Sequence, residues 1–267
     1  MKAAIIGDLH GALAKIKKIP LKDVDLIQLT GDLGKADLAR SMAFENIERR
    51  REGLPEIEHS AKLKKEAYME SYTSSVDAVN YLRKFAPVQL VFGNVEFSNA
   101  ETRKQAREIG AKLPFLYDKL QGMKGVRVLN NSLANVGGVR VGGLEYFSDV
   151  SWVREFKPKP YSERLRRAGV ETRKARRVLK WFGKNLDILL CHQPPYGILD
   201  KVNFKGAPKG WNGKHAGSKA ILDYIKRFGP RYVVCGHIHE AEGKKKVGDT
   251  EVINVGAVGS HYILDIK

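Results

Sequence analysis

Short apolar segments of this chain repeatedly end in glycine followed by an oxygen-bearing or imidazole side chain. The first is residues 3–6, an apolar run that leads directly into Gly7, Asp8 and His10. Such a run is typical of a buried β-strand. Polar residues just past the carboxyl end of a strand lie where α/β proteins gather their chemistry. One such turn alone is more often an ordinary surface turn than a site, so its repetition carries the argument.

A similar ending follows four later apolar runs, at residues 24–29, 88–92, 187–191 and 231–235, with a glycine before the polar residue in all but the third. The side chains behind the five predicted strands are Asp8 and His10, Asp32, Asn94, His192, and His237 with His239. All of them are oxygen or imidazole donors and none is a thiolate, a set that suits Mn, Fe, Zn or Ni. Seven donors are too many for one tetrahedral ion. They fit two ions about 3.5 to 4 Å apart that share a bridging carboxylate.

The order of predicted elements favours one mixed α/β domain with two sheets over residues 1–267. Strand–helix units flank a middle part of short strands, at residues 126–129, 132–136 and 139–141, joined by Asn-Asn and Gly-Gly. Because these dipeptides suit hairpin turns, we expect that part to be antiparallel. Helical and basic insertions are expected around residues 36–86 and 145–184.

Local signals refine this outline. Asn99 and Ser218 are expected helix N-caps, and Trp181 and Phe182 are expected to face the core at the end of a helix over residues 162–184. Cys191 and Cys235 each end an apolar run, so both are expected to be reduced and buried. The alternative is a disulfide between neighbouring strands.

The charge balance bears on partners. The formal net charge is +17, and residues 154–184 contain twelve Lys or Arg against three Glu, which gives 12 − 3 = +9 in 31 residues. This stretch is either a solvated basic face or a surface for phosphate-rich partners. The sequence shows neither an apolar run near 18 residues nor a signal peptide, so we expect a cytoplasmic protein without a membrane partner.

In its five motif blocks the chain resembles the calcineurin-like metallophosphoesterase superfamily. That family's pattern runs Asp-x-His, Gly-Asp, Gly-Asn-His-Asp/Glu, His and Gly-His-x-His, and the blocks here are Gly7 to His10, Gly31-Asp32, Gly93 to Glu96, His192 and Gly236 to His239. All five stand in the family's order. The resemblance implies a four-layer αββα sandwich with the site at the strand ends, in a prokaryotic phosphodiesterase-like branch. The chain has only five glutamines, and a low glutamine content is typical of proteins from thermophiles.

The resemblance also implies a role for each matching position. Asp8, His10 and His239 would hold one metal, and Asn94, His192 and His237 the second, with Asp32 as the bridge. Mn is the expected metal, with Fe, Ni, Zn or Mg as alternatives. Two such cations act as Lewis acids and lower the pKa of a water that becomes the nucleophile, so neither Ser nor Cys is needed. Asp32 and Asn94 therefore also count as catalytic candidates.

One position departs from the family pattern. Val95 stands where the family has a histidine credited with protonating the leaving oxygen or orienting the substrate. Losing a general acid costs about 10² to 10⁴ in rate, so we expect activity on diesters or activated esters and weak action on alkyl monophosphates. His215 is a candidate replacement acid or phosphate contact, and the alternative is an ordinary loop histidine.

Other residues near the motifs have two interpretations each. Glu96 either orients a neighbouring ligand or is an exposed glutamate. Tyr196, Trp211 and Asn212 lie in loops, where they either line the pocket or serve packing.

The leading hypothesis is a two-metal phosphodiesterase for a small or nucleotide-like phosphate ester. A nuclease that uses the basic stretch at residues 154–184 is the second, and a scaffold of the same fold without catalysis is the third.

Overall fold

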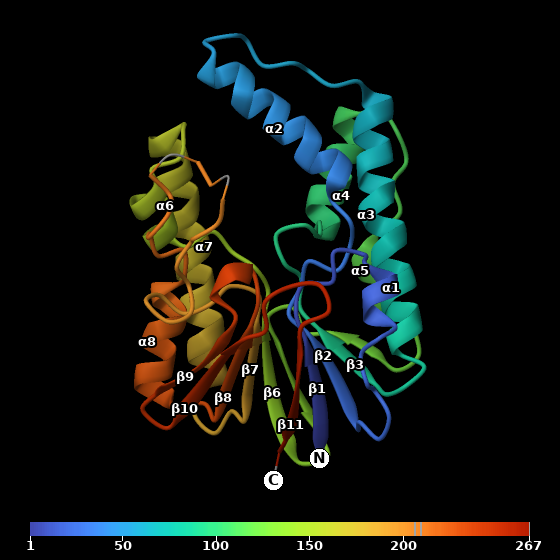
Figure 1. The fold of residues 1–267 in the computed structure, drawn as a ribbon, viewed down its shortest axis with the longest axis vertical. Coiled ribbons are helices and arrows are strands. Elements are labelled where there is room, and N and C mark those ends of the chain that lie inside the picture. Colours follow the sequence, from blue (N-terminus) through green and yellow to red (C-terminus); the bar gives the residue numbers. More distant parts are fainter. Residues whose placement is uncertain (206, 209, 267) are drawn as a thin grey trace.

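The computed structural model describes residues 1–205, 207–208 and 210–266, and shows two stacked β-sheets (Figure 1). The first sheet has the strand order β11 (His261–Asp265), β1 (Lys2–Ile6), β2 (Leu26–Leu29), β3 (Val88–Leu90) and β4 (Val126–Val128). The second has the order β5 (Ser132–Val136), β6 (Val139–Leu144), β7 (Ile188–Cys191), β8 (Tyr232–Cys235), β10 (Thr250–Asn254) and β9 (Gly243–Val247). Inner strands of both sheets pair in parallel, whereas β11, β5 and β9 are antiparallel edge strands.

Helices cover the outer face of each sheet. Against the first sheet pack α1 (Leu13–Ile16), α3 (Ala61–Leu82) and α5 (Leu116–Gln121), and against the second pack α7 (Tyr161–Phe182) and α8 (Lys219–Phe228). The remaining helices are α2 (Asp37–Arg51), α4 (Asn99–Glu108), α6 (Val150–Phe156) and the short 3-10 helix His239–Ala241. The molecule is therefore the expected four-layer αββα sandwich.

The central strands β1 and β7 are almost wholly apolar because both of their faces are buried. In β1, Ala3 and Ile5 point between the sheets, and Ala4 and Ile6 point to the helices that cover the first sheet. In β7, residues 188 and 190 join the core between the sheets, and residues 189 and 191 contact the layer of α7 and α8. A strand in this position cannot alternate apolar with polar residues, which is why the runs read as continuous.

The expected antiparallel middle is wrong for its first strand. Strand β4 pairs in parallel with β3 in the first sheet, and only β5 and β6 form a hairpin, at Gly137 and Gly138. The Asn-Asn pair instead crosses from one sheet to the other. Asn130 accepts a hydrogen bond from the Phe92 amide at 2.9 Å, and Asn131 adopts the left-handed conformation with φ of 54°. An asparagine that tolerates positive φ serves this crossover as well as a hairpin.

The expectations about helix N-caps and core positions are confirmed only in part. Ser218 caps α8 as expected, but Ser98 rather than Asn99 caps α4, in a capping box with Glu101. Phe182 is fully buried, whereas Trp181 is 60% exposed, so the expectation that both face the core is wrong for Trp181. Adjacent residues on a helix point about 100° apart, and only one of them can face the sheet.

Cys191 and Cys235 are buried and not in a disulfide, which confirms the expected reduced pair.

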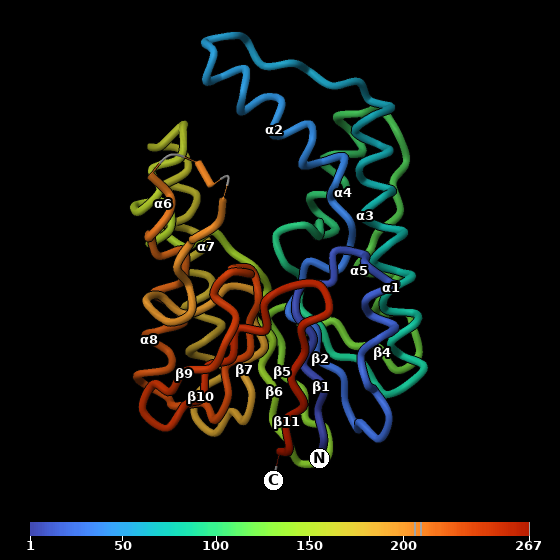
Figure 2. The backbone as a smooth tube through the Cα atoms, viewed as in Figure 1, coloured from blue at the N-terminus to red at the C-terminus, as the bar shows by residue number. Residues whose placement is uncertain are grey.

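The region around residues 36–86 has two different parts. The later turns of α3 belong to the core, because Ala78, Val79 and Leu82 are buried against the first sheet. Helix α2 buries none of its residues. It lies beyond the carboxyl ends of the strands and extends from the side of α3 toward the side of α6 (Figure 2).

That the whole chain forms a single domain stays a prediction. Across the described residues, every helix is too short or too polar to span a bilayer.

Candidate metal centre

The loops behind five parallel strands converge at one end of the sandwich. They follow β1, β2, β3, β7 and β8, and each contributes one or two of the seven side chains singled out from the sequence. Because the two sheets are stacked, the carboxyl ends of β1 to β3 face those of β7 and β8 (Figure 1). This stacking brings together residues that lie more than two hundred positions apart in the chain.

Asp8, His10 and His239 form a first cluster, whose ligand atoms all lie within 4.8 Å of one another. The His239 Nε2 atom is 3.0 Å from Asp8 Oδ2 and 3.4 Å from His10 Nε2. Asp8 is fully buried and also accepts hydrogen bonds from the His237 amide at 2.9 Å and from the Thr30 hydroxyl at 3.2 Å. These bonds fix the carboxylate, so a cation here would meet a preorganised oxygen.

His192 is the centre of a second cluster. Its Nδ1 lies 2.9 Å from the Thr30 carbonyl, which is the geometry of a donated hydrogen bond, and this leaves the Nε2 lone pair free. Nε2 points to Asn94 Oδ1 at 2.9 Å and to Asp32 Oδ1 at 3.6 Å. Asp8, Asp32 and His192 again have ligand atoms within 4.8 Å of one another. This cluster shares Asp8 with the first and adjoins it directly.

His237 completes the set from the side of β8. Its ring centroid is 4.8 Å from that of His192 and 5.7 Å from that of Tyr146. Burial, and then the neighbouring His192, lower the pKa of His237 to about 3. The imidazole is therefore neutral at physiological pH, which is the form that binds metals.

The site contains more buried carboxyl groups than positively charged partners for them. Asp8, Asp32 and Glu96 are three buried carboxyl groups in adjoining loops. Burial raises the pKa of Asp8, but His192 and His239 more than offset this, so its pKa lies below the ordinary value. Buried carboxylates with few compensating cations are costly unless they are paired or bind metal. The donor set and its charge thus fit two divalent ions.

Strained backbone and close packing hold these loops. His10, Asp32 and His237 have φ values of 42°, 45° and 67°, in the left-handed region that non-glycine residues rarely adopt. Such strain persists only where surrounding contacts enforce it, and it concentrates at functional sites. At Gly236 a β-carbon would lie 2.8 Å from the Thr30 hydroxyl and nearer still to Asp8 Oδ1. The glycines before Asp8, Asp32, Asn94 and His237 therefore permit the loops to approach.

Glu96 is buried and ties two of these loops together. Its carboxylate accepts hydrogen bonds from the amides of Asp32, Leu33 and Gly93 at 3.0, 2.7 and 2.8 Å. Burial and the charge of Asp32 raise its pKa to about 7. Of the two interpretations of this residue, the exposed glutamate is wrong. Glu96 positions the backbone of Asp32.

His215 is placed apart from these clusters. Its Nδ1 is 2.7 Å from the carboxylate of the buried Asp200, and its ring lies against that of Tyr196. Its backbone also forms a bridge with Lys201. Within the described residues, none of the seven clustered side chains is among these contacts. Trp211 packs on Phe156 with ring centroids 4.7 Å apart, so its interpretation as packing holds.

The remaining loop residue, Asn212, accepts a hydrogen bond from the Phe204 amide at 3.2 Å within its own loop.

Two neighbours of the site escaped the sequence analysis. Arg40 of α2 places its Nη2 3.3 Å from His10 Nδ1. Nothing in the sequence marks it, because it is one cation among many on a polar helix. Tyr146 is different, since it stands two residues after β6. Reading every strand end for side chains of any kind would have found it.

Comparison with known proteins agrees with this geometry. The model of the calcineurin-like phosphoesterase family matches residues 1–241. The chain therefore belongs to the calcineurin-like phosphoesterase family.

Relatives with curated sequences match over shorter stretches. An uncharacterized protein of Methanocaldococcus jannaschii is 36% identical over 87 residues, which cover 32% of this chain and 36% of that protein. Metallophosphoesterase domain-containing protein 1 of Homo sapiens is 35% identical over 86 residues, 31% of this chain and 24% of that protein. The matched segments span only 16% to 36% of the length of the curated relatives.

Among solved structures, the phosphopantetheinyl hydrolase of Mycobacterium tuberculosis is similar with a TM-score of 0.56 and 15% identity. That similarity covers 97% of this chain and 89% of the other, and it concerns the fold.

Proposed function

We propose that this protein is a phosphodiesterase that depends on two divalent cations. Asp8, His10 and His239 would hold one cation, Asn94, His192 and His237 would hold the other, and Asp32 would be shared between them. The observation that carries this proposal is the pair of adjoining donor clusters, Asp8 with His10 and His239 and Asp8 with Asp32 and His192, each with three ligand atoms within 4.8 Å. Asn94 and His237 lie next to His192 of the second cluster. When bound, the two cations supply Lewis-acid polarisation of phosphoryl oxygens and a water of lowered pKa.

The protein's own residues then orient the reactants. Asp32 is held on two sides, because its Oδ1 accepts the Val95 amide at 3.0 Å and its amide donates to Glu96. Arg40 is exposed beside His10, where its guanidinium suits a non-bridging phosphoryl oxygen. His215, which is paired with Asp200 outside the seven-residue clusters, is our proposal for the replacement acid or phosphate contact.

The preference for diesters follows from Val95. Its side chain can neither donate nor accept a proton, and its amide is already bonded to Asp32. Residue 95 therefore cannot protonate a leaving group, and esters whose leaving group needs a proton should react slowly. Rates on bis(p-nitrophenyl) phosphate and p-nitrophenyl phosphate test this preference, and a monoester rate well above the diester rate would contradict it. V95H is expected to raise the rate on an alkyl phosphate, whose leaving group needs a proton, more than the rate on the nitrophenyl diester.

Manganese is the cation we propose, with Fe, Ni, Zn or Mg as alternatives. Protein treated with a chelator should lose diester hydrolysis and should regain it when Mn²⁺ is added. Mass spectrometry of the reactivated protein should then show two ions per chain. H239A should retain fewer ions than the native protein. Full activity in the metal-free protein would refute the proposal. Bound metal without turnover on any ester would favour the scaffold.

A nuclease with the same chemistry is the second candidate. The exposed Trp181 stands on α7 within the basic stretch, where it is available for stacking on a base. A gel shift with single-stranded and double-stranded oligonucleotides over a salt series tests this. Binding that weakens with salt, together with cleavage, favours the nuclease. The absence of both leaves the small or nucleotide-like diester.

A further inference from the structure

A pocket of about 380 Å³ opens beside the metal centre, between α2, α3 and the loop of residues 94–97. The wall on the side of the metal centre contains Asn94 and Val95, and Arg40 stands at the same edge. Asn94 is also 2.9 Å from His192, and Arg40 is 3.3 Å from His10. The pocket therefore begins where the proposed phosphate site ends, with two residues common to both.

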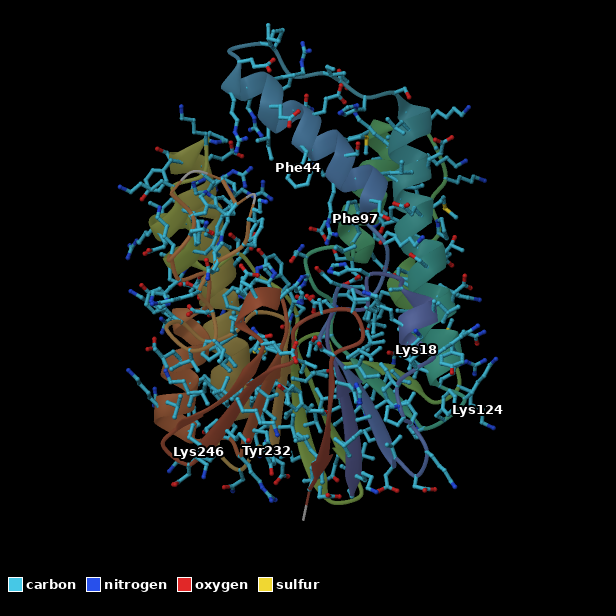
Figure 3. The ribbon with its side chains drawn as sticks, in the orientation of Figure 1. Lys18, Phe44, Phe97, Lys124, Tyr232 and Lys246 are labelled. Atoms are coloured by element: carbon cyan, nitrogen blue, oxygen red, sulfur yellow. The ribbon has the colours of Figure 1, made fainter. Side chains whose placement is uncertain are left out.

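The rest of the wall is mostly apolar and partly aromatic, with Lys64, Ser71 and Gln105 among its polar members. It includes Ala39 and Ala43 from α2, Ala67, Tyr68 and Tyr72 from α3, and Phe97. The rings of Tyr68 and Tyr72 are stacked, and Phe97 meets Tyr68 edge-on with centroids 5.8 Å apart. Figure 3 labels Phe97 near α4, beneath α2.

Two polar groups on this wall, the Tyr68 hydroxyl and the Glu96 carboxylate, are already hydrogen-bonded. The Tyr68 hydroxyl donates to the Pro114 carbonyl at 2.5 Å and lies 3.2 Å from Thr102. The Glu96 carboxylate accepts three backbone amides. These residues thus offer a ligand ring faces and methyl groups. Pockets of this size and character take compact organic groups.

We infer that this pocket binds an apolar, ring-bearing group esterified to the phosphate that the metal centre holds. The inference rests on the proposed function and specifies its substrate class. Val95 supports it from the metal side, since an apolar residue there continues the wall toward phosphorus. Arg40 fixes the boundary, with charge on one side and the apolar wall on the other.

The test compares phenylphosphonate with methylphosphonate as inhibitors of bis(p-nitrophenyl) phosphate hydrolysis in Mn²⁺. Both present the same phosphonate to the metal centre and differ only in the group that would enter the pocket. We expect phenylphosphonate to bind at least about tenfold more tightly, since burying a ring removes considerable apolar surface from water. A ratio of inhibition constants within about threefold of one would overturn the inference.

Two variants fill the pocket from its exposed side, A39W and A43W. Both positions line the pocket on α2, which has no buried residues, so the core is untouched. Each is expected to bring the inhibitor ratio to within about threefold of one. The matched control is S41W, on the same helix at an exposed position outside the pocket wall. It should keep the native ratio.

The ratio is measured within each variant, so a general loss of protein affects both inhibitors equally. A native ratio in both A39W and A43W would overturn the inference. If methylphosphonate does not inhibit and no ester is hydrolysed, the metal centre itself fails, and the inference fails with it. If the ratio of inhibition constants is close to one while diester hydrolysis is intact, only the inference about the pocket is overturned.

Discussion

Gly93 is the position where one added methyl group should disturb the fold and the metal centre together. Its β-carbon would lie 2.6 Å from the Asp32 amide and 2.8 Å from His192 Cε1, and nearer still to Asp32 Oδ1. Unstrained contacts between heavy atoms need about 3.5 Å. G93A therefore requires Asp32 or His192 to move by roughly 1 Å. Neither residue can move without cost, because Asp32 is hydrogen-bonded to Val95 and Glu96, and His192 is hydrogen-bonded to Thr30.

The magnitude follows from these contacts. Overpacking a tight interior costs about 1–3 kcal/mol. Loss of the charge-assisted bond from the Val95 amide to Asp32 adds about 1.5–3 kcal/mol. We expect G93A to lose about 2.5–6 kcal/mol of unfolding free energy, a large share of the 5–15 kcal/mol typical of a domain. A shift of about 1 Å in a reacting group also costs roughly a hundredfold in rate.

Urea unfolding, metal content and kcat/KM on the diester measure this prediction. The control is G169A in helix α7, where the β-carbon would meet only Arg173 Nη1 at an ordinary 3.5 Å. That change should stabilise the protein by about 0.5–1 kcal/mol, because alanine is the better helix former. Native stability, metal content and kcat/KM in G93A would refute the reasoning about close approach.

Three further changes have clear expected outcomes. R40A removes an exposed guanidinium beside His10; it should raise KM for diesters about tenfold and alter unfolding free energy by less than about 0.5 kcal/mol, which kinetics and urea titration check. S98A removes the N-cap of α4 and should cost about 1 kcal/mol in urea, and no loss would show that the capping box is not stabilising. Burial raises the pKa of Tyr224 to about 12, and its hydroxyl donates to the Gly183 carbonyl at 2.9 Å. Since the folded pKa exceeds the unfolded one, this contribution is complete below about pH 10 and disappears as pH rises toward 12. Unfolding free energy should therefore fall more steeply over that range in the native protein than in Y224F, and equal slopes would contradict the assignment.

The sequence was most informative where burial left the chain little choice. Strands covered on both faces are largely apolar, so their ends stand out wherever a polar residue follows. That contrast was enough to locate Asp8, Asp32 and His192 before any coordinates were known. Asp8 and Asp32 lie together because parallel strands in one sheet end on the same side, and the stacking of the two sheets brings His192 to them.

The sequence was least informative about contacts that depend on three-dimensional approach. Glu96 could have been exposed, and only the fold shows that it accepts amides from two different loops. The direction of β4 depended on whether an Asn-Asn pair turns back or crosses between sheets, and both use positive φ. Arg40 reaches His10 only because α2 extends beyond the strand ends.

The segment from Gly93 to Phe97 links three properties that the sequence shows as separate. Gly93 permits the approach of Asp32, Asn94 faces His192, and Glu96 fixes the loop that carries Asp32. Val95 bonds to Asp32 through its amide and reaches the apolar pocket through its side chain. A histidine at residue 95 would offer a proton beside the metals at the expense of the apolar wall. The proton donor and the apolar pocket thus compete for this one side chain, and its valine favours binding of an apolar group over protonation of a poor leaving group.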